Sequence, residues 1–252
     1  MLQNLTRHNP LWERLKLDRH YLDFMSSMNT SIRRLAKDIV NKYIIENMTI
    51  GLGSGSAVAA IVGELGRISF KDSLTFIPTS LQIELVAEEN NLRINDESRI
   101  SEIDIVFDGA DQIDSNLNMI KGGGGALLKE KIITSASPKL VISADSTKYV
   151  SSFTRPVPIE VHKFARHIVY DKLKKIGGQP QLRTLEKGYP FITESSNLIY
   201  DTIFEPNENH RQKENEIKSI PGVIEVGLFT RRADAYYKAN NDGSFEIICG
   251  SS

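Results

Sequence analysis

The chain has 252 residues, of which 40% are hydrophobic and 25% are charged, as in ordinary globular proteins. Its formal charge of −1 gives no positive field for nucleic acid, and its longest apolar run, Ala57 to Val62, is too short to span a membrane. The single cysteine, Cys249, excludes an intrachain disulfide and a thiolate metal cluster. We therefore expect a cytoplasmic protein that binds small anions through local groups, with no membrane or nucleic-acid partner.

The first 30 residues include three acidic residues, Glu13, Asp18 and Asp23, and no apolar core of signal-peptide length. They resemble neither a secretory signal nor a transit peptide. We expect a short accessory arm that packs Trp12 and its apolar neighbours on the body of the protein or on a second subunit. A disordered arm is the alternative.

Apolar residues recur at helical spacing over residues 31–45, after possible capping residues at 29–31. A short strand then leads into a glycine-rich turn, GLGSGS at 51–56, and a helix over 57–65. A strand, glycine-rich turn and helix in this order bind phosphates through backbone N–H groups and hydroxyls. This turn lacks the lysine of a P-loop and has Ser at the last position of GxGxxG. By itself it fits a nucleotide, a sugar phosphate or a tight turn.

Strands and helices continue to alternate up to residue 150, which predicts an α/β fold with a parallel sheet and helices on both faces. Strands are expected at 74–78, 92–95, 103–107 and 139–144, and a helix at 79–89. Because ligands gather at the carboxyl ends of such strands, the segments that follow them should share one crevice. The segments expected at this crevice are the turn at 51–56, Thr79-Ser80, Asp108 to Asp111 and the glycines at 122–125. The strand at 139–144 carries Asp145 to Lys148 at its carboxyl end.

Three aspartates, Asp108, Asp111 and Asp114, follow the strand at 103–107. Such a cluster can hold Mg²⁺ or Ca²⁺, although the EF-hand pattern is absent. Lys121 and Lys148 offer a positive charge instead of a metal, and Asp is also common as a turn residue. Of the three, Asp114 is the one expected to be only structural.

The segment KGGGGALLKE, residues 121–130, carries four consecutive glycines, which favour unusual backbone angles or close approach of a ligand. A helix is expected directly afterwards, over 126–135. The glycine run would therefore open a helix N-terminus, where free N–H groups and the helix dipole favour anions. Lys121 adds a positive charge at its entrance.

Glu130 falls beside an apolar stripe of that helix, next to Leu127 and Ile133. Partial burial would raise its pKa and make it a better proton acceptor near neutral pH. The alternative is a surface glutamate in a mixed charged helix, since Lys129 also falls among apolar neighbours. Helix geometry alone favours the surface interpretation.

A change of pattern after Thr154 predicts a small α+β domain over residues 156–229. Its expected elements are strands at 156–161, 181–183, 191–193, 198–200 and 223–229, with helices at 164–176 and 207–220. A terminal hairpin, 234–237 with 245–248 around the turn at 241–243, should return to the first domain. That domain would comprise residues 31–155 and 230–252.

Taken together, six motifs resemble ribose-5-phosphate isomerase of the A type in order and spacing. They are GLGSGSAV, DGADQID, KGGGGALLKEKI, SADSTK, PVPIEV and IPGVIEVGLF, within about residues 31 to 250. The resemblance implies a Rossmann-like domain with a ferredoxin-like lid, assembled as a homodimer or homotetramer. It also implies interconversion of D-ribose 5-phosphate and D-ribulose 5-phosphate, in the pentose phosphate pathway, without metal or other cofactor.

The family's functional residues carry over by position. Glu130 matches the proton-transferring base, Asp108 and Asp111 match the carboxylates at the sugar hydroxyls, and Lys121 matches part of the substrate clamp. The other expected substrate-binding residues are Ser54, Gly55, Ser56, Ala57, Gly109, Ala110, Gly122, Gly123, Gly124 and Lys148. Moving a carbonyl between C1 and C2 needs one base and groups that stabilise an enediolate, roles that suit Glu130 and Lys121.

The phosphate-side loop departs from the family pattern GTGST. Ser54 keeps a hydroxyl at the first Thr position, whereas Ala57 has none at the second. One phosphate hydrogen bond is therefore expected to be missing. Arg33 or Arg34 is the candidate for a compensating cation.

Two other classes of function remain as alternatives. A sugar-phosphate sensor on the same fold would usually carry a DNA-binding module, for which the first 30 residues show no pattern. A deaminase or CoA-transferase relative would share the scaffold but not the pairing of DGAD with KGGGG.

Overall fold

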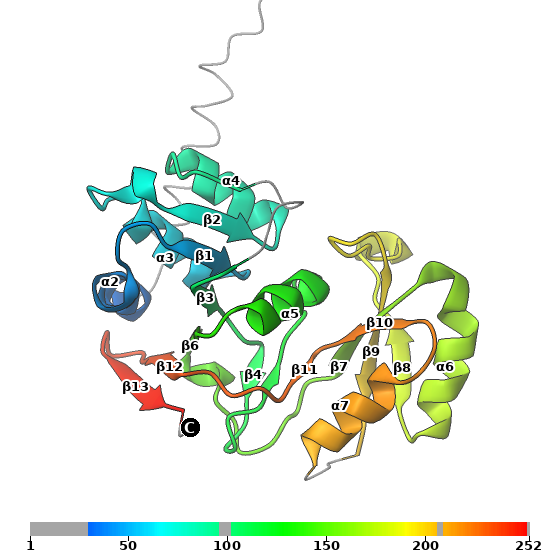
Figure 1. Cartoon of the computed structure of the whole chain (residues 1–252). Coiled ribbons are helices and arrows are strands. Elements are labelled where there is room, and N and C mark those ends of the chain that lie inside the picture. The colour runs from blue at the N-terminus through cyan, green and yellow to red at the C-terminus, as the bar shows by residue number, and fades with distance from the viewer. Residues whose placement is uncertain (1–29, 96–101, 206–208, 251–252) are drawn as a thin grey trace, which may run out of the picture.

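The computed structural model describes residues 30–95, 102–205 and 209–250. The expected N-terminal arm lies outside these residues. Figure 1 shows two parts, a large sheet with the first helices and the chain end, and a smaller sheet with α6 and α7. A short third sheet lies between them, beside helix α5. The first prediction, an α/β fold with a Rossmann-like parallel sheet, is confirmed.

The large sheet has six strands in the order β13-β12-β6-β3-β1-β2. All neighbours run parallel except β12 and β13, which form the expected terminal hairpin. The strands are β1 (Thr49–Leu52), β2 (Thr75–Pro78), β3 (Ile105–Asp108), β6 (Leu140–Asp145), β12 (Ala235–Ala239) and β13 (Phe245–Cys249).

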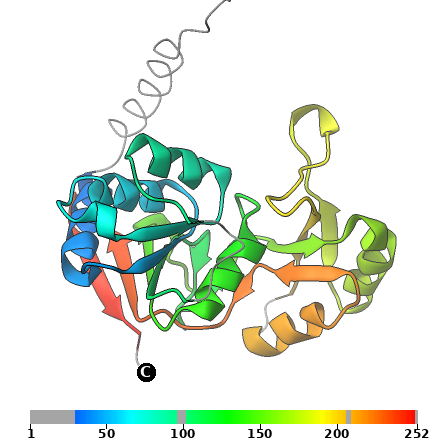
Figure 2. The same cartoon turned by 45° about the horizontal axis from the view of Figure 1, so that its top comes forward.

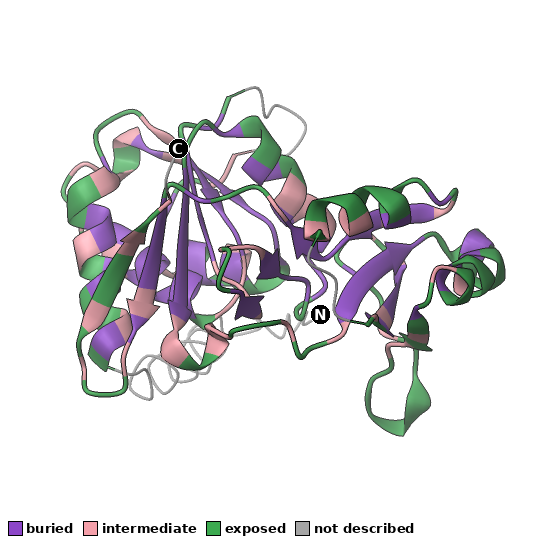
Figure 3. Ribbon diagram, turned by 90° about the horizontal axis from the view of Figure 1, so that it is seen from below, coloured by how far each residue is buried: buried purple, intermediate pink, exposed green. Residues whose placement is uncertain are grey.

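Side chains alternate between the two faces of this sheet. Phe107 and Val141 pack on one side, with helices α2 (Thr30–Tyr43), α3 (Ser56–Leu65) and α4 (Leu81–Glu89). Val106 and Ile142 pack on the other, with helix α5 (Leu127–Ala136). The central strands are therefore buried on both faces, as Figure 3 shows in purple.

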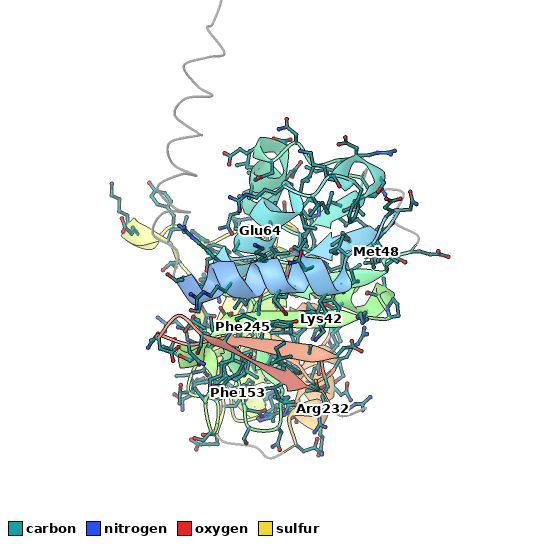
Figure 4. All side chains as sticks on the ribbon, turned by 90° about the vertical axis from the view of Figure 1, so that its left-hand side faces the viewer. Lys42, Met48, Glu64, Phe153, Arg232 and Phe245 are labelled. Carbon is teal, nitrogen blue, oxygen red and sulfur yellow. The ribbon has the colours of Figure 1, made fainter. Side chains whose placement is uncertain are left out.

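The terminal hairpin completes the core beneath α2. Tyr237 of β12 is fully buried, and its hydroxyl donates a hydrogen bond to Asp38 of α2 at 2.9 Å. Its ring lies 5.8 Å from that of Phe245, which Figure 4 shows beside α2. The end of the chain is thus part of the first domain's packing.

The smaller sheet, called the second sheet from here on, is antiparallel with strand order β10-β7-β9-β8. Its strands are β7 (Val157–Val161), β8 (Gln179–Leu182), β9 (Leu198–Ile203) and β10 (Val223–Val226). Helices α6 (Arg166–Lys175) and α7 (His210–Lys218) connect them in the order strand, helix, two strands, helix, strand. This is the expected ferredoxin-like arrangement, with its core between sheet and helices. The loop between β8 and β9 projects away from both helices (Figure 2).

The strand expected over 223–229 is instead two strands in two sheets. After β10, Gly227 separates it from β11 (Leu228–Phe229), which joins β5 (Met119–Ile120) and β4 (Gln112–Ile113) in the third sheet. Gly227 donates to Pro158 O at 2.7 Å and accepts from Lys121 N at 2.9 Å. A Cβ there would lie 2.3 Å from Lys121 O, so only glycine fits between the two strands.

The predictions of two other strands are wrong. Residues 191–193 form no strand, because the chain there turns back to donate from Phe191 N to Arg183 O. Residues 92–95 contribute only one bridge, between Ile94 and Phe76. Short 3₁₀ turns also occur among the described residues, at Lys71–Ser73, Ser146–Lys148, Lys163–Ala165 and Glu186–Gly188.

In the parts of the chain that the structure describes, no helix has both the length and the apolar character needed to cross a membrane.

Candidate active site

The candidate site lies at the carboxyl edge of the parallel sheet, where the chain after β1 meets the chain after β3. Gly53 N donates to Phe107 O at 2.8 Å, and Ser54 N donates to the Asp108 carboxylate at 3.3 Å. A Cβ on Gly53 would lie 1.9 Å from Asp108 Oδ1, so this approach requires glycine. Beside it opens a cavity of about 210 Å³. The sheet edge predicted from strand order therefore carries the pocket.

Lys121 is the centre of the charged group beneath this cavity. Its Nζ lies 2.9 Å from Asp108 Oδ2 and 3.1 Å from Glu130 Oε2, and it donates to Gly109 O at 2.8 Å. All three charged side chains are buried, with at most 4% of each exposed. One ammonium group therefore holds two carboxylates that burial would otherwise disfavour.

Glu130 is buried, so the interpretation as a surface glutamate is wrong. It lies in the first turn of α5, beside Leu127 and Ile133, which pack into the core. Its Oε1 accepts a hydrogen bond from Ser54 Oγ at 2.6 Å. The helical wheel could not decide this because α5 contacts neighbouring structure on more than one side. The carboxylate reaches the cavity from the interior.

The pKa values reflect this burial. Burial and the nearby Glu130 charge raise the pKa of Asp108 to about 7, against the opposing effect of Lys121. Burial lowers the pKa of Lys121, but Asp108 and Glu130 outweigh it and raise that pKa above its ordinary value. The site thus combines a permanent cation with a carboxyl group that exchanges its proton near neutral pH.

The phosphate-side turn lies at the N-terminus of α3. Gly55 precedes the helix with a positive φ of 93° and offers no side-chain cap to the first amides of α3, and Ser54, Gly55 and Ser56 line the cavity. Ala57 lines the cavity without a hydroxyl. The prediction that Arg33 or Arg34 supplies a compensating cation at this cavity is wrong. Ile32, rather than Arg33 or Arg34, reaches this cavity, and Arg34 donates to Gly243 O.

The three aspartates of the turn have different surroundings. Asp111 accepts from Gly123 N at 2.7 Å and lines the cavity. Asp114 instead accepts from Asn116 N and Asn118 N, at 2.9 and 2.8 Å, which is the turn role expected for it. Within residues 30–95, 102–205 and 209–250, no three acidic, His or Cys side chains are grouped to hold a metal ion.

The structure brings the predicted site residues together. All of them line the cavity except Asp108, which lies beneath it against Lys121. The lining residues that the sequence interpretation missed are Ile32, Gln82, Ser143 and Asp145. Asp145 ends β6 and Gln82 lies in the first turn of α4, so the rule of carboxyl strand ends could have found both.

Comparison with known proteins agrees with this geometry. A family model described as ribose 5-phosphate isomerase A (phosphoriboisomerase A) matches residues 75–243. Ribose-5-phosphate isomerase A of Methanosarcina acetivorans is 37% identical over 231 residues, which cover 89% of this chain and 98% of that protein. The chain belongs to the ribose 5-phosphate isomerase A family.

Solved structures support the same assignment. Ribose 5-phosphate isomerase from Plasmodium falciparum superposes with a TM-score of 0.82 at 33% identity, covering 89% of this chain and all of that one. A D-ribose-5-phosphate isomerase solved in complex with phospho-erythronic acid gives a TM-score of 0.80 at 33% identity, covering 88% and 100%. The chain is therefore an aldose–ketose isomerase that interconverts D-ribose 5-phosphate and D-ribulose 5-phosphate, the reaction of the pentose phosphate pathway.

The raised pKa of Asp108 in this isomerase predicts a pH-dependent stability difference. A native pKa of about 7, against an ordinary 3.8, means that the folded state retains a proton which the unfolded chain has lost. The stability contributed by this proton is present at acid pH and is lost as the pH rises through about 7. An amide side chain at this position does not titrate. Asp108→Asn should therefore become progressively more stable than the wild type as the pH rises from about 4 to 7, with a constant difference above that.

Urea unfolding across this pH range measures the difference. Asp72→Asn, at an exposed position, controls for the loss of one carboxylate. A stability advantage of Asp108→Asn that grows toward acid pH would instead show that Lys121 depresses the pKa of Asp108.

Proposed function

We propose that Glu130 is the base that carries a proton between C1 and C2 of the open-chain sugar phosphate. The observation that supports this most is its buried carboxylate, which meets the cavity with Ser54 Oγ at 2.6 Å and Lys121 Nζ at 3.1 Å. These two contacts fix the direction of the carboxylate. A positioned base of this kind contributes about 10²–10⁴ in rate.

Lys121 and the glycine turn stabilise the intermediate in this proposal. Removal of the C2 proton leaves an enediolate, whose negative oxygens need donors already in place. Lys121 supplies the charge, and Gly124, on the cavity wall, supplies a backbone N–H group, since the N–H of Gly123 already donates to Asp111. Asp111 lines the cavity and would contact the sugar hydroxyls during ring opening, whereas Asp108 lies beneath the cavity and would act through its contact with Lys121.

The substrate's phosphate would bind at the N-terminus of α3, at residues 54–57, and at Lys148. The free amides of the first turn of α3 and the hydroxyl of Ser56 support this, while the hydroxyl of Ser54 donates to Glu130. The complex of one solved relative with phospho-erythronic acid is consistent with such a ligand. A sugar acid phosphate combines a phosphate with a planar anionic carboxylate, which resembles an enediolate in charge and shape.

Glu130→Gln tests the base directly. The amide has nearly the same volume and keeps a hydrogen-bonding oxygen for Ser54, but it cannot accept the substrate proton. We expect kcat for conversion of ribose 5-phosphate to the ketose to fall by about 10³-fold or more, while the Kd for phospho-erythronic acid changes by no more than about threefold.

The measurements are a ketose assay and calorimetric titration. Glu88→Gln, an exposed carboxylate on α4, is the matched control and should keep wild-type kcat. If Glu130→Gln also keeps wild-type kcat, Glu130 is not the base.

Metal removal gives a second prediction. Lys121 Nζ already occupies the position of a cation 2.9 Å from Asp108, and Asp114 is engaged by the backbone of its own turn. Activity after dialysis against EDTA should therefore equal that of the untreated enzyme. A loss that Mg²⁺ or Mn²⁺ restores would make the aspartate cluster a cation site.

We also propose the domain division 31–155 with 230–252, and 156–229, with an arm before residue 31. A homodimer or homotetramer in the cytoplasm completes the proposal. Exposed apolar side chains on the part that contains the second sheet support self-association, among them Phe164 and Tyr189, which are 86% and 68% exposed. The single cysteine is consistent with a reducing compartment.

A further inference from the structure

Arg183, directly after β8, connects the second sheet with the glycine turn of the site. Its guanidinium donates from Nη1 to the carbonyl oxygens of Gly122 and Gly123, at 2.7 and 3.0 Å. Its other edge donates to both carboxylate oxygens of Asp201 on β9, from Nε at 2.8 Å and from Nη2 at 2.5 Å. The fork geometry of the pair with Asp201 fixes the plane of the guanidinium.

These two carbonyl contacts determine where the next amides point. In a trans peptide the C=O of one residue and the N–H of the next point in opposite directions, and the described residues contain no cis peptide. With Gly122 O held by Arg183, Gly123 N–H points away and donates to Asp111 at 2.7 Å. With Gly123 O held likewise, Gly124 N–H points away from Arg183, and Gly124 lines the cavity.

A second residue from the same part of the chain, Phe191, packs against Gly125 at the other end of the glycine turn. Phe191 lies under the guanidinium of Arg183, 5.5 Å from ring centroid to Cζ. A Cβ on Gly125 would come within 2.5 Å of the Phe191 ring, so ring and backbone are in close contact. Glu194 N also donates to Gly125 O at 3.3 Å. The glycine turn is therefore held on its outer side by residues 183–194.

We propose that Arg183, oriented by Asp201, is a positioning residue of the isomerase reaction. It fixes the peptide planes at 122–124 so that Asp111 is held and the amide of Gly124 faces the oxygen on which negative charge develops. Arg183 acts through the backbone and does not touch the sugar. This inference rests on the proposed role of the glycine amides, but it does not depend on Glu130 being the base.

A purely structural clamp would have a different signature. Arg183 ties two parts of the chain together, so its loss would lower the unfolding midpoint and the fraction of active enzyme, without changing kcat per folded site. A positioning role predicts the reverse, a lower kcat in an enzyme that remains folded. KM would change little, because the phosphate turn at 54–57 is untouched.

The test compares Arg183→Ala with Arg166→Ala, an exposed arginine on α6 that lies outside the cavity lining. Loss of one preorganised donor typically costs about 10²–10³ in kcat, so a misaligned donor should cost about 10- to 100-fold. We expect this fall in kcat for Arg183→Ala with KM within about threefold, and wild-type values for Arg166→Ala.

Chemical rescue separates the two roles. Added guanidinium ion can refill the space left in Arg183→Ala and contact the same carbonyls, so kcat should rise with guanidinium but not with an equal concentration of sodium chloride. The rescue should be absent in Arg166→Ala. Arg183→Lys should retain a low kcat, because one ammonium group cannot span two carbonyls and a carboxylate.

Three results would overturn the inference. They are wild-type kcat in folded Arg183→Ala, lost activity explained entirely by a lower unfolding midpoint, and a folded, slow variant that guanidinium does not rescue. If Arg183→Ala does not fold, Asp201→Asn and Arg183→Lys carry the same test. Full activity of Glu130→Gln would refute the proposed base and leave this result unaffected.

Discussion

Lys121 places one ammonium group between the carboxylates of Asp108 and Glu130, 2.9 and 3.1 Å away, in a part of the protein closed to bulk water. Two buried carboxylates so close together repel each other and lose hydration. Without the cation, neither their positions nor their negative charges would persist. The rest of the site follows from this contact. It determines how the end of β3, the strand before the glycines and the first turn of α5 meet, and it leaves Ser54 free to orient Glu130 from the other side.

The sequence predicted the elements that depend on local chemistry. Alternation of apolar strands with helices predicted the parallel sheet, and the rule that ligands lie at carboxyl strand ends brought the residues after β1 and β3 to one cavity. The order of helices and strands in the second sheet was also predicted as a small α+β domain, and the family resemblance implied its ferredoxin-like arrangement. The glycines at 122–125 predicted unusual backbone angles or a close approach, and the structure shows positive φ at Gly122 and Gly125. The close approach of Gly53 to Asp108 was not predicted.

Features that depend on tertiary contacts were not predictable in this way. A helical wheel shows which residues share a face but not what covers that face, so helix geometry alone wrongly favoured a surface position for Glu130. The run at 223–229 has uniform strand character, yet Gly227 divides it between two sheets. Arg183 lies in a segment with no motif. Its importance comes from Asp201 and the carbonyls of the glycine turn, which are distant in sequence.

Gly227 joins the two halves of the molecule through its own backbone. Its N–H donates a hydrogen bond to Pro158 O of the second sheet, and its C=O accepts one from Lys121 N. There is no room for a side chain between them. A tilt of the second sheet would therefore displace Lys121, with its ammonium group, as well as the glycines at 122–125.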